Sequence, residues 1–228
     1  MDIRNVTFRR RIKNLGRTAA LLMGMWLSLL FLPYLAAQDM NNSEDNIEKE
    51  MEVATFGAGC FWCVEAIFER VRGVAEVKSG YSGGHVKNPS YKEVCSGSTG
   101  HAEVCQISYN PKLITYSELL EVFWKTHNPT TLNRQGNDIG TQYRSAVFYH
   151  TEEQKRIAEE MKSRLNLEKI WEDPIITEIV AFEEFYPAED FHEDYYARNP
   201  NQGYCNFIIT PKINKFEKIF KDYLKEEK

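Results

Sequence analysis

The chain has 228 residues, of which 43% are hydrophobic, enough apolar material for a globular core. Its formal net charge is −5 at pH 7, although the first 17 residues carry six basic side chains against one acidic side chain. The remainder is therefore near −10, and so acidic a balance argues against nucleic acid or anionic lipid as a partner.

The N-terminal segment differs from everything after it. The basic stretch 1–17 is followed by the nearly unbroken apolar run Thr18–Leu35 and by two small residues, Ala36 and Ala37. These are the parts of a secretory signal in their usual order. The apolar run is also about long enough to cross a bilayer as a helix, which takes roughly 17–20 residues. We therefore expect residues 1–37 to be a signal peptide or an N-terminal membrane anchor, and the rest of the chain to be exported to the periplasm or the extracellular space.

Residues 38–52 are polar and charged without apolar periodicity, and we expect them to form a flexible spacer. No repeat, low-complexity tract or second linker follows. Residues 53–228 are therefore expected to form one domain.

Short strands and helices alternate along this domain. Strands are predicted for 53–56, 74–77, 104–109, 143–149, 175–182 and 207–210. Helices are predicted for 61–70, from Thr115 to about 126, from Thr151 to about 165, and after Pro211, which the first turn of a helix tolerates. Thr115 with Glu118 and Thr151 with Gln154 have the spacing of capping boxes. The stretches 78–100 and 131–140 are predicted to be loops. This irregular mixture predicts a two-layer α+β sandwich with a mixed sheet.

Five cysteines follow the leader: Cys60, Cys63, Cys95, Cys105 and Cys205. Exported domains held by disulfides usually carry an even number, so an odd number suggests a reactive thiol. Cys95 and Cys105 are interpreted as small buried apolar residues, which is a common role for free cysteine.

Cys60 lies where a predicted strand leads into a helix, directly after Gly59. A thiol at a helix N-terminus faces free backbone N–H groups and the positive end of the helix dipole, which favour the thiolate and lower the pKa. Cys63 completes a C-x-x-C pair. A zinc site would need a second pair at similar spacing, but Cys95 and Cys105 lie ten residues apart, so zinc is disfavoured. Taken alone, the pair indicates a thiol–disulfide exchanger.

Three polar residues are further candidates for chemistry. Glu103 begins a predicted strand, Asp138 lies in a polar loop, and Tyr143 follows soon after. Isolated residues of these types more often have solvated or capping roles than catalytic ones.

Several blocks of sequence resemble the A-type methionine sulfoxide reductase family. They are GCFW at 59–62, YKEVCSG at 91–97, TGHAE at 99–103, NDIGTQYRS at 137–145, AEDFH at 188–192, NP at 199–200 and GYC at 203–205. Blocks that match in the family's order and spacing, from about 53 to 210, are far more specific than any one motif. The resemblance implies a ferredoxin-like core and reduction of methionine S-sulfoxide, free or in proteins, so that oxidised exported proteins are repaired.

The resemblance also implies roles for the residues around the thiol. Cys60 corresponds to the nucleophile and Cys205 to the resolving thiol. Phe61 and Trp62 correspond to an apolar wall that receives the methyl group of the sulfoxide. The chain departs from the commonest family pattern at Cys63, where glycine is usual, and it has one cysteine near the C-terminus. Cys63 therefore remains an alternative resolving thiol.

The polar candidates gain roles in the same way. Glu103 corresponds to the proton donor, Tyr91 and Tyr143 to hydrogen-bond donors to the sulfoxide oxygen, and Asp138 to a polar residue that supports the site. A glutamate donates a proton near neutral pH only if burial raises its pKa, because desolvation disfavours the carboxylate.

In the implied reaction the Cys60 thiolate attacks sulfur, methionine leaves, and the resulting sulfenic acid condenses with a second thiol to form a disulfide. A thioredoxin-like dithiol then reduces this disulfide, so neither a bound cofactor nor a metal is expected, and the enzyme is expected to be a monomer. Two alternatives remain. One is a thiol–disulfide exchanger that uses Cys60 and Cys63 and has no need of Glu103. The other is an exported binding module whose cysteines are structural.

Overall fold

The computed structural model describes residues 51–226. The leader predicted for 1–37 lies outside this range, as does the spacer predicted for 38–52 except for its last two residues. Within the described range, no helix is both long enough and apolar enough to cross a membrane.

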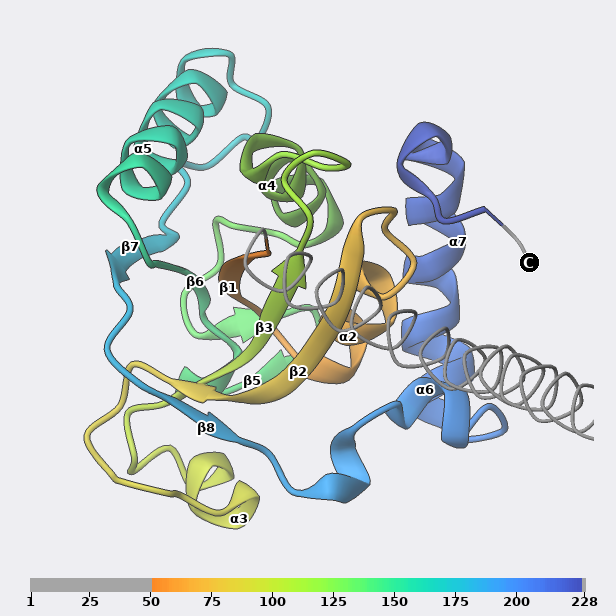
Figure 1. Cartoon of the computed structure of the whole chain (residues 1–228). Helices are drawn as coiled ribbons and strands as arrows, with labels where there is room; N and C mark the ends of the chain where they lie inside the picture. The colour runs from red at the N-terminus through yellow and green to blue at the C-terminus, as the bar shows by residue number, and fades with distance from the viewer. Residues whose placement is uncertain (1–50, 227–228) are drawn as a thin grey trace, which may run out of the picture. The chain divides into compact units, whose positions relative to one another are not determined.

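The centre of the domain is a six-stranded sheet with the strand order β7-β6-β1-β3-β2-β8 (Figure 1). The strands are β1 (Glu52–Ala58), β2 (Val74–Ser82), β3 (Ala102–Tyr109), β6 (Ser145–Tyr149), β7 (Glu178–Ala181) and β8 (Phe185–Pro187). Neighbouring strands are antiparallel except β6 and β7, which are parallel. Helix α2 (Phe61–Phe68) connects β1 to β2, and α4 (Tyr116–Thr126) follows β3. The inner strands and these helices form a βαββαβ unit, which confirms the predicted α+β class with a mixed sheet and a ferredoxin-like core.

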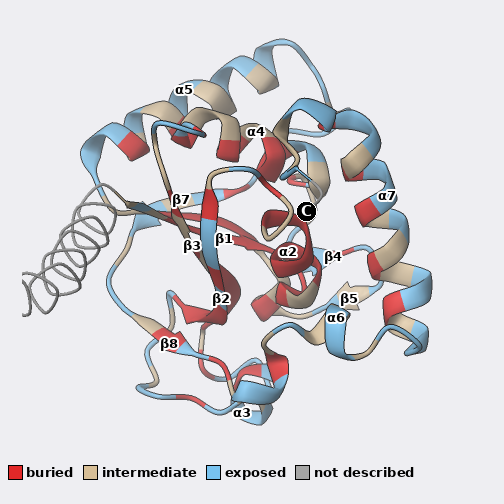
Figure 2. Cartoon of the chain, turned by 45° about the vertical axis from the view of Figure 1, so that its right-hand side comes forward, coloured by how far each residue is buried: buried red, intermediate tan, exposed pale blue. Residues whose placement is uncertain are grey.

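The helices share one large apolar core with the sheet. Helix α7 (Thr210–Ile219) packs against α2 and α4, and α5 (Glu152–Leu167) packs against α4, β6 and β7. Figure 2 shows α2 and the central strands buried, whereas the outer sides of α5 and α7 are exposed. The remaining elements are α3 (Tyr91–Cys95), β4 (Arg134–Gln135), β5 (Asp138–Ile139), α6 (Tyr195–Arg198), a π-helical turn (Cys205–Ile209) and the 3-10 turns Thr141–Tyr143, Asp190–His192 and Lys221–Tyr223. Cys60, at the start of α2, therefore lies at the edge of the main core.

The predicted capping residues begin both long helices. At α4 the Thr115 side chain accepts a hydrogen bond from the Glu118 backbone, and the Glu118 side chain accepts one from the Thr115 backbone, which confirms the box. At α5 only half of the box forms. Thr151 accepts from the Gln154 backbone, but the Gln154 side chain accepts from the His150 backbone and donates to β1. This second contact ties α5 to the sheet.

Residues 207–210, predicted as a strand, are helical. The π-helical turn Cys205–Ile209 runs directly into α7, with Pro211 in the first turn as expected. Ile209, Ile213 and Phe216 recur at helical spacing and are buried in the main core, while Phe207 is exposed. A short apolar run of this kind does not distinguish a strand from a buried helix by periodicity alone.

Four other predictions differ from the structure in their bounds or content. The strand predicted for 143–149 begins at Ser145, because residues 141–143 form a 3-10 turn. The strand predicted for 175–182 is limited to β7. The loop predicted for 78–100 contains the end of β2 and helix α3, and the loop predicted for 131–140 contains the β4–β5 hairpin. Strand β8, which pairs with β2, has no counterpart among the predicted elements.

Candidate active site

Cys60 is the N-cap residue of α2, directly after β1. Gly59 makes the turn with φ of +92°, and a Cβ atom at this position would lie 2.6 Å from the side chain of Gln135. Glycine is needed because other residues rarely adopt this φ and because the space is already filled. Gln135 belongs to β4, so the same packing brings the β4–β5 hairpin, which carries Asp138, toward Cys60.

Glu103 is the second residue of β3 and points toward the N-terminus of α2. Side chains alternate along a strand, and Glu103 shares its face with Cys105 and Ile107, which belong to the main core. The Phe61 backbone N–H, one of those that lack a partner within the helix, donates a hydrogen bond to Glu103 Oε2 at 3.1 Å. The alternation along β3 therefore places this carboxyl beside Cys60.

The Glu103 carboxyl is 1% exposed. Burial raises its pKa to about 8, and the charges of Asp138 and Cys63 add to this effect, whereas the hydrogen bond from Phe61 opposes it. At pH 7 the carboxyl is therefore mostly protonated. This is the state that an acid catalyst near neutral pH requires.

Tyr91 and Tyr143 lie near Glu103 on two separate elements, α3 and the turn Thr141–Tyr143. Burial raises the pKa of both phenols well above the usual value, and smaller contributions, among them the charge of Glu103, act in the same direction. Both hydroxyl groups therefore stay protonated and can donate hydrogen bonds. Tyr91 is held in place by its backbone N–H, which donates to Glu189 Oε1 at 2.9 Å, and by stacking against Phe61 with ring centroids 6.4 Å apart.

Phe61 and Trp62 belong to an aromatic cluster beside the thiol. Phe61 is buried, whereas Trp62 is half-buried and stacks on Tyr195 with ring centroids 3.6 Å apart. The indole Nε1 of Trp62 donates to His192 Nδ1 at 3.1 Å, and Tyr204 meets the indole ring by its edge. These contacts fix the orientation of the Trp62 ring.

Asp138 is tied to the site by Tyr204. The Tyr204 hydroxyl donates to Asp138 Oδ2 at 2.8 Å, and the charge of Cys60 helps burial to raise the pKa of this phenol well above its usual value. A cavity of about 440 Å³, lined in part by these two residues and the exposed Phe207, lies beside them. Tyr204 received no role from the sequence, although it directly precedes Cys205 in the GYC block.

The structure thus brings together most of the predicted site residues, and it adds others that sequence reasoning missed. The added residues are His192, Tyr195, Tyr204 and Glu189. His192, Glu189 and Tyr204 lie inside two of the sequence blocks that resemble the family, AEDFH and GYC. This position could have identified them from the sequence.

The Cys60 and Cys63 thiols lie one helical turn apart at the start of α2 and affect each other's ionisation. The Cys60 thiol, with a smaller contribution from the Lys212 ammonium, lowers the pKa of Cys63 to about 7 against the effect of burial. Burial, then the Cys63 thiol and the charge of Glu103, raise the pKa of Cys60. The predicted lowering of the Cys60 pKa is therefore wrong, because desolvation outweighs the helix terminus. The two thiols titrate as a unit, which loses its first proton near neutral pH.

The remaining cysteines have different environments. Cys205 is fully buried in the π-helical turn, where burial and then the charge of Cys63 raise its pKa. Cys105 is buried as predicted, with its thiol 3.5 Å from the carbonyl oxygen of Phe61. Cys95, predicted to be buried, is exposed at the end of α3. Across residues 51–226, no three His, Cys, Asp or Glu side chains are grouped so that they could hold a metal ion.

Proteins of a known family match the chain over most of its length. The model of the family described as peptide methionine sulfoxide reductase matches residues 52–224. The chain is 59% identical over 172 residues to peptide methionine sulfoxide reductase MsrA of Sulfolobus acidocaldarius, which covers 75% of this chain and 97% of the relative. It is 53% identical over 168 residues to MsrA of Leptospira borgpetersenii, which covers 74% and 94%.

Solved structures agree with this match. Mxr1 from Saccharomyces cerevisiae in reduced form superposes with a TM-score of 0.63 at 37% identity, covering 69% of this chain and 90% of that one. Methionine sulfoxide reductase A of Corynebacterium diphtheriae gives 0.61 at 34% identity, covering 67% and 77%. Together with a cysteine at a helix start and a buried, protonated glutamate beside it, these matches show that the chain belongs to the peptide methionine sulfoxide reductase family and is a peptide-methionine (S)-S-oxide reductase.

Proposed function

We propose that this enzyme reduces methionine S-sulfoxide, free or in proteins, through a sulfenic acid on Cys60 and an intramolecular disulfide. The observation that carries this proposal is the buried carboxyl of Glu103, which the Phe61 N–H holds beside Cys60 with its pKa raised to about 8 by burial. A sulfoxide oxygen is a poor leaving group unless it is protonated, and this carboxyl is a proton source at neutral pH.

The first step uses Cys60 as the nucleophile. The Cys60–Cys63 pair loses one proton near neutral pH, and transfer of the remaining proton from Cys60 to Cys63 leaves the thiolate on Cys60. This thiolate attacks the sulfoxide sulfur while Glu103 protonates the oxygen, which accepts hydrogen bonds from Tyr91 and Tyr143. The attack forms a bond between Cys60 Sγ and the substrate sulfur; this bond and the sulfur–oxygen bond of the substrate then break as the protonated oxygen passes to Cys60 Sγ. Methionine leaves as the thioether, and Cys60 carries the sulfenic acid.

The aromatic cluster supports a choice between the two epimers at sulfur. Phe61 and Trp62 form an apolar wall for the methyl group, and the hydroxyl groups of Tyr91 and Tyr143 bind the oxygen. Asp138 supports the site through its hydrogen bond with Tyr204. A substrate of the opposite configuration would direct its oxygen toward the wall, which has no donor for it.

A second thiol then condenses with the sulfenic acid, and a thioredoxin-like dithiol reduces the disulfide. Cys205 is the thiol that corresponds to the family's resolving residue, and Cys63 is the alternative. The enzyme is proposed to act as a monomer without a bound cofactor. The leader predicted for 1–37, a signal peptide or an N-terminal membrane anchor, supports export of the enzyme and repair of oxidised proteins outside the cytosol.

The test is release of thioether from peptides that contain either the S- or the R-sulfoxide, with dithiothreitol as reductant. Turnover of the S-epimer alone is expected. The C-x-x-C pair and the pKa of Cys63 favour a thiol–disulfide exchanger as the second candidate. Reduction of insulin disulfides without release of thioether from either peptide would establish that candidate instead.

A further inference from the structure

We infer that a basic groove along α7 binds the substrate polypeptide on one side of the oxidised methionine, and that Lys212 and Lys215 select substrates with an acidic side chain there. The inference rests on the proposed function, because it concerns the protein substrates of the same active site. It names the class of sequence that the enzyme should repair fastest, an acidic segment next to a methionine S-sulfoxide.

Two cavities form the groove. The first has a volume of about 440 Å³ and begins at Asp138 and Tyr204, which belong to the active site. The second has a volume of about 350 Å³ and lies along α7. Gln135 and Lys212 line both cavities, so the second continues the first. A polypeptide whose sulfoxide lies at Cys60 therefore has a path from the active site along α7.

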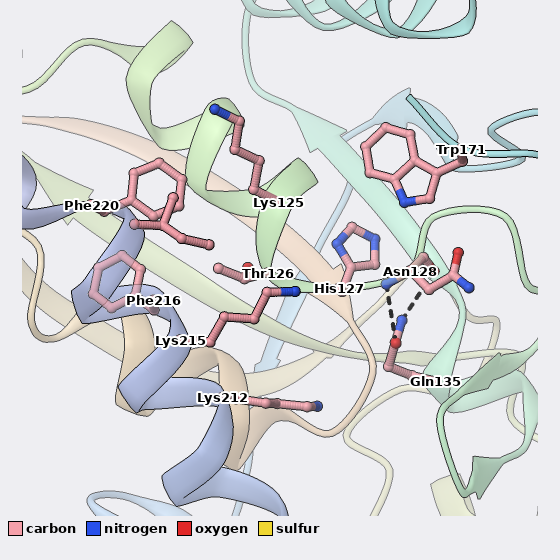
Figure 3. Close-up of a pocket in the computed structure, with 11 residues that line it drawn as sticks. Lys125, Thr126, His127, Asn128, Gln135, Trp171, Lys212, Lys215, Phe216 and Phe220 are labelled. Carbon is pink, nitrogen blue, oxygen red and sulfur yellow. Dashed lines mark hydrogen bonds between the residues drawn. The ribbon is translucent and has the colours of Figure 1, made fainter. Parts of the chain in front are cut away.

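The basic side of the groove belongs to α7. Lys212 and Lys215 are three residues apart, so they lie on one face of the helix and about 4.5 Å apart along its axis. Figure 3 shows both side chains extending from α7 toward the opposite wall, where Asn128 and Gln135 lie. Among residues 51–226, no carboxylate lies within ion-pair distance of either ammonium.

The other charged groups leave this positive potential in place. Lys125 also lines the second cavity, but it is paired with Glu121 at 2.6 Å. His127 is neutral at pH 7, because desolvation lowers its pKa to about 4. None of the residues that line the second cavity is acidic. The two lysines of α7 therefore determine the charge of this part of the groove.

The wall opposite α7 is fixed by the folded chain. Gln135 Oε1 accepts a hydrogen bond from the Asn128 N–H at 3.1 Å, and Gln135 Nε2 donates to the Asn128 carbonyl at 3.1 Å. The side chain of Gln135 also fills the space beside Gly59, in the turn that carries Cys60. The groove is therefore held in a constant position relative to the nucleophile before a substrate binds.

Charge complementarity identifies the occupant. The whole chain has a formal net charge of −5 at pH 7, yet two ammonium groups without carboxylate partners face this cavity. A glutamate or aspartate of the substrate would pair with them. Phe207, which is 81% exposed and lines the first cavity, offers an apolar contact to the residues between the sulfoxide and the acidic side chain. An extended polypeptide, which advances about 3.3–3.6 Å per residue, can make both contacts in succession.

The experiment is a competition between two peptides in one tube, with dithiothreitol as the reductant. Both carry one methionine S-sulfoxide, and they differ by glutamate or glutamine at a single position, which is moved along the peptide on either side of the sulfoxide. The ratio of the two thioethers gives the ratio of kcat/KM, in which any effect of Lys212 on the ionisation of Cys63 cancels. On one side, glutamate should be preferred by about two- to fivefold, the usual contribution of an ion pair at a partly exposed site.

Substitutions on α7 assign this preference to the groove. Lys212→Met and Lys215→Met should each weaken it, and the double variant should abolish it. Lys218→Met is the matched control and should retain it, because Lys218 is exposed on the same helix and lines neither cavity. Since Lys212 borders both cavities, the glutamate that depends on it should be closer to the sulfoxide than the one that depends on Lys215. Added salt should weaken the preference in the wild type.

Three results would contradict these expectations. A wild type without preference for glutamate at any position, or a preference that survives in the double variant, would overturn the inference. Unchanged peptide competition in the double variant, with a loss confined to turnover by a thioredoxin-like reductant, would assign the groove to the reductant and overturn the inference as well. Absence of thioether release from every peptide would instead overturn the proposed function.

Discussion

Burial changes the reactivity of Cys60 and Glu103 in opposite directions. Both are buried, and burial favours the neutral form of each. For Glu103 the neutral form is the proton donor, so burial prepares it for the reaction. For Cys60 the neutral form is the less reactive one. The neighbouring Cys63 thiol compensates, because the pair loses one proton near neutral pH and either sulfur can carry the charge.

Replacement of Cys60 by serine should abolish reduction of methionine sulfoxide even in excess dithiothreitol. The external dithiol replaces the recycling step but cannot replace the nucleophile. Thioether release under single-turnover conditions measures the effect, and circular dichroism shows whether the variant folds. Substantial turnover in a folded Cys60→Ser protein would contradict the mechanism.

Replacement of Glu103 by glutamine should slow formation of the sulfenic acid by roughly 10²–10⁴, the usual contribution of general acid catalysis. The amide keeps an acceptor for the Phe61 N–H, so the fold should be retained. In the wild type the same step should slow as the pH rises through about 8, since the carboxyl then loses its proton. An unchanged single-turnover rate in Glu103→Gln would assign the proton to another donor.

At the scale of elements, the site depends on how β1 ends and α2 begins. The turn at Gly59 sets the position of Cys60 at the helix start, and the side chain of Gln135 fills the space beside it. The β4–β5 hairpin therefore packs on the turn that carries the nucleophile. A substitution in this turn is therefore expected to shift the positions of both the Cys60 thiol and Asp138.

Gly59→Ala should destabilise the fold by about 1–3 kcal/mol through backbone strain, with a further loss from the contact with Gln135. Gly136→Ala is the matched control, because its φ is +62° but nothing lies within 4 Å of the added Cβ. Unfolding in urea measures both variants. Equal destabilisation by the two substitutions would show that the packing against Gln135 contributes little.

At the scale of the whole molecule, a second group of carboxyls, of which Glu65 is buried, links α2 to the chain segment before α6. Glu65 is 1% exposed and accepts a hydrogen bond from Ser79 Oγ. Burial raises the pKa of Glu65 to about 8 and that of Glu69 to about 7, with Glu193 and Asp194 as acidic neighbours. Tyr195 directly follows Asp194 and stacks on Trp62. These carboxyls therefore lie next to the residue that supports the apolar wall of the active site.

The contribution of Glu65 and Glu69 to the stability of the protein should fall as the pH rises from 5 to 9. A carboxyl whose pKa is raised in the folded state binds its proton more tightly there than in the unfolded chain, so its contribution is complete below the unfolded pKa and is lost as the pH passes the folded value. Glu65→Gln should remove part of this dependence and raise the melting temperature relative to the wild type at pH 9. A melting temperature difference that stays constant from pH 5 to pH 9 would contradict this assignment.

The sequence by itself determined the features that depend on neighbouring residues. The capping box of Thr115, the proline in the first turn of α7 and the position of Cys60 after Gly59 were all predicted, because caps and turns involve residues a few positions apart. The α+β class followed from the alternation of such elements. The family resemblance then indicated which polar residues to consider, among them Glu103.

Only the tertiary structure decided how distant residues meet and how their charges behave. The bond from Phe61 to Glu103 joins α2 to β3, and the bond from Tyr204 to Asp138 joins the start of the C-terminal helical region to the β4–β5 hairpin. These contacts depend on sheet pairing and on which helix faces are buried, neither of which a local pattern specifies. The Cys60 pKa was predicted in the wrong direction for the same reason, since the sequence shows the helix terminus but not the desolvation that outweighs it.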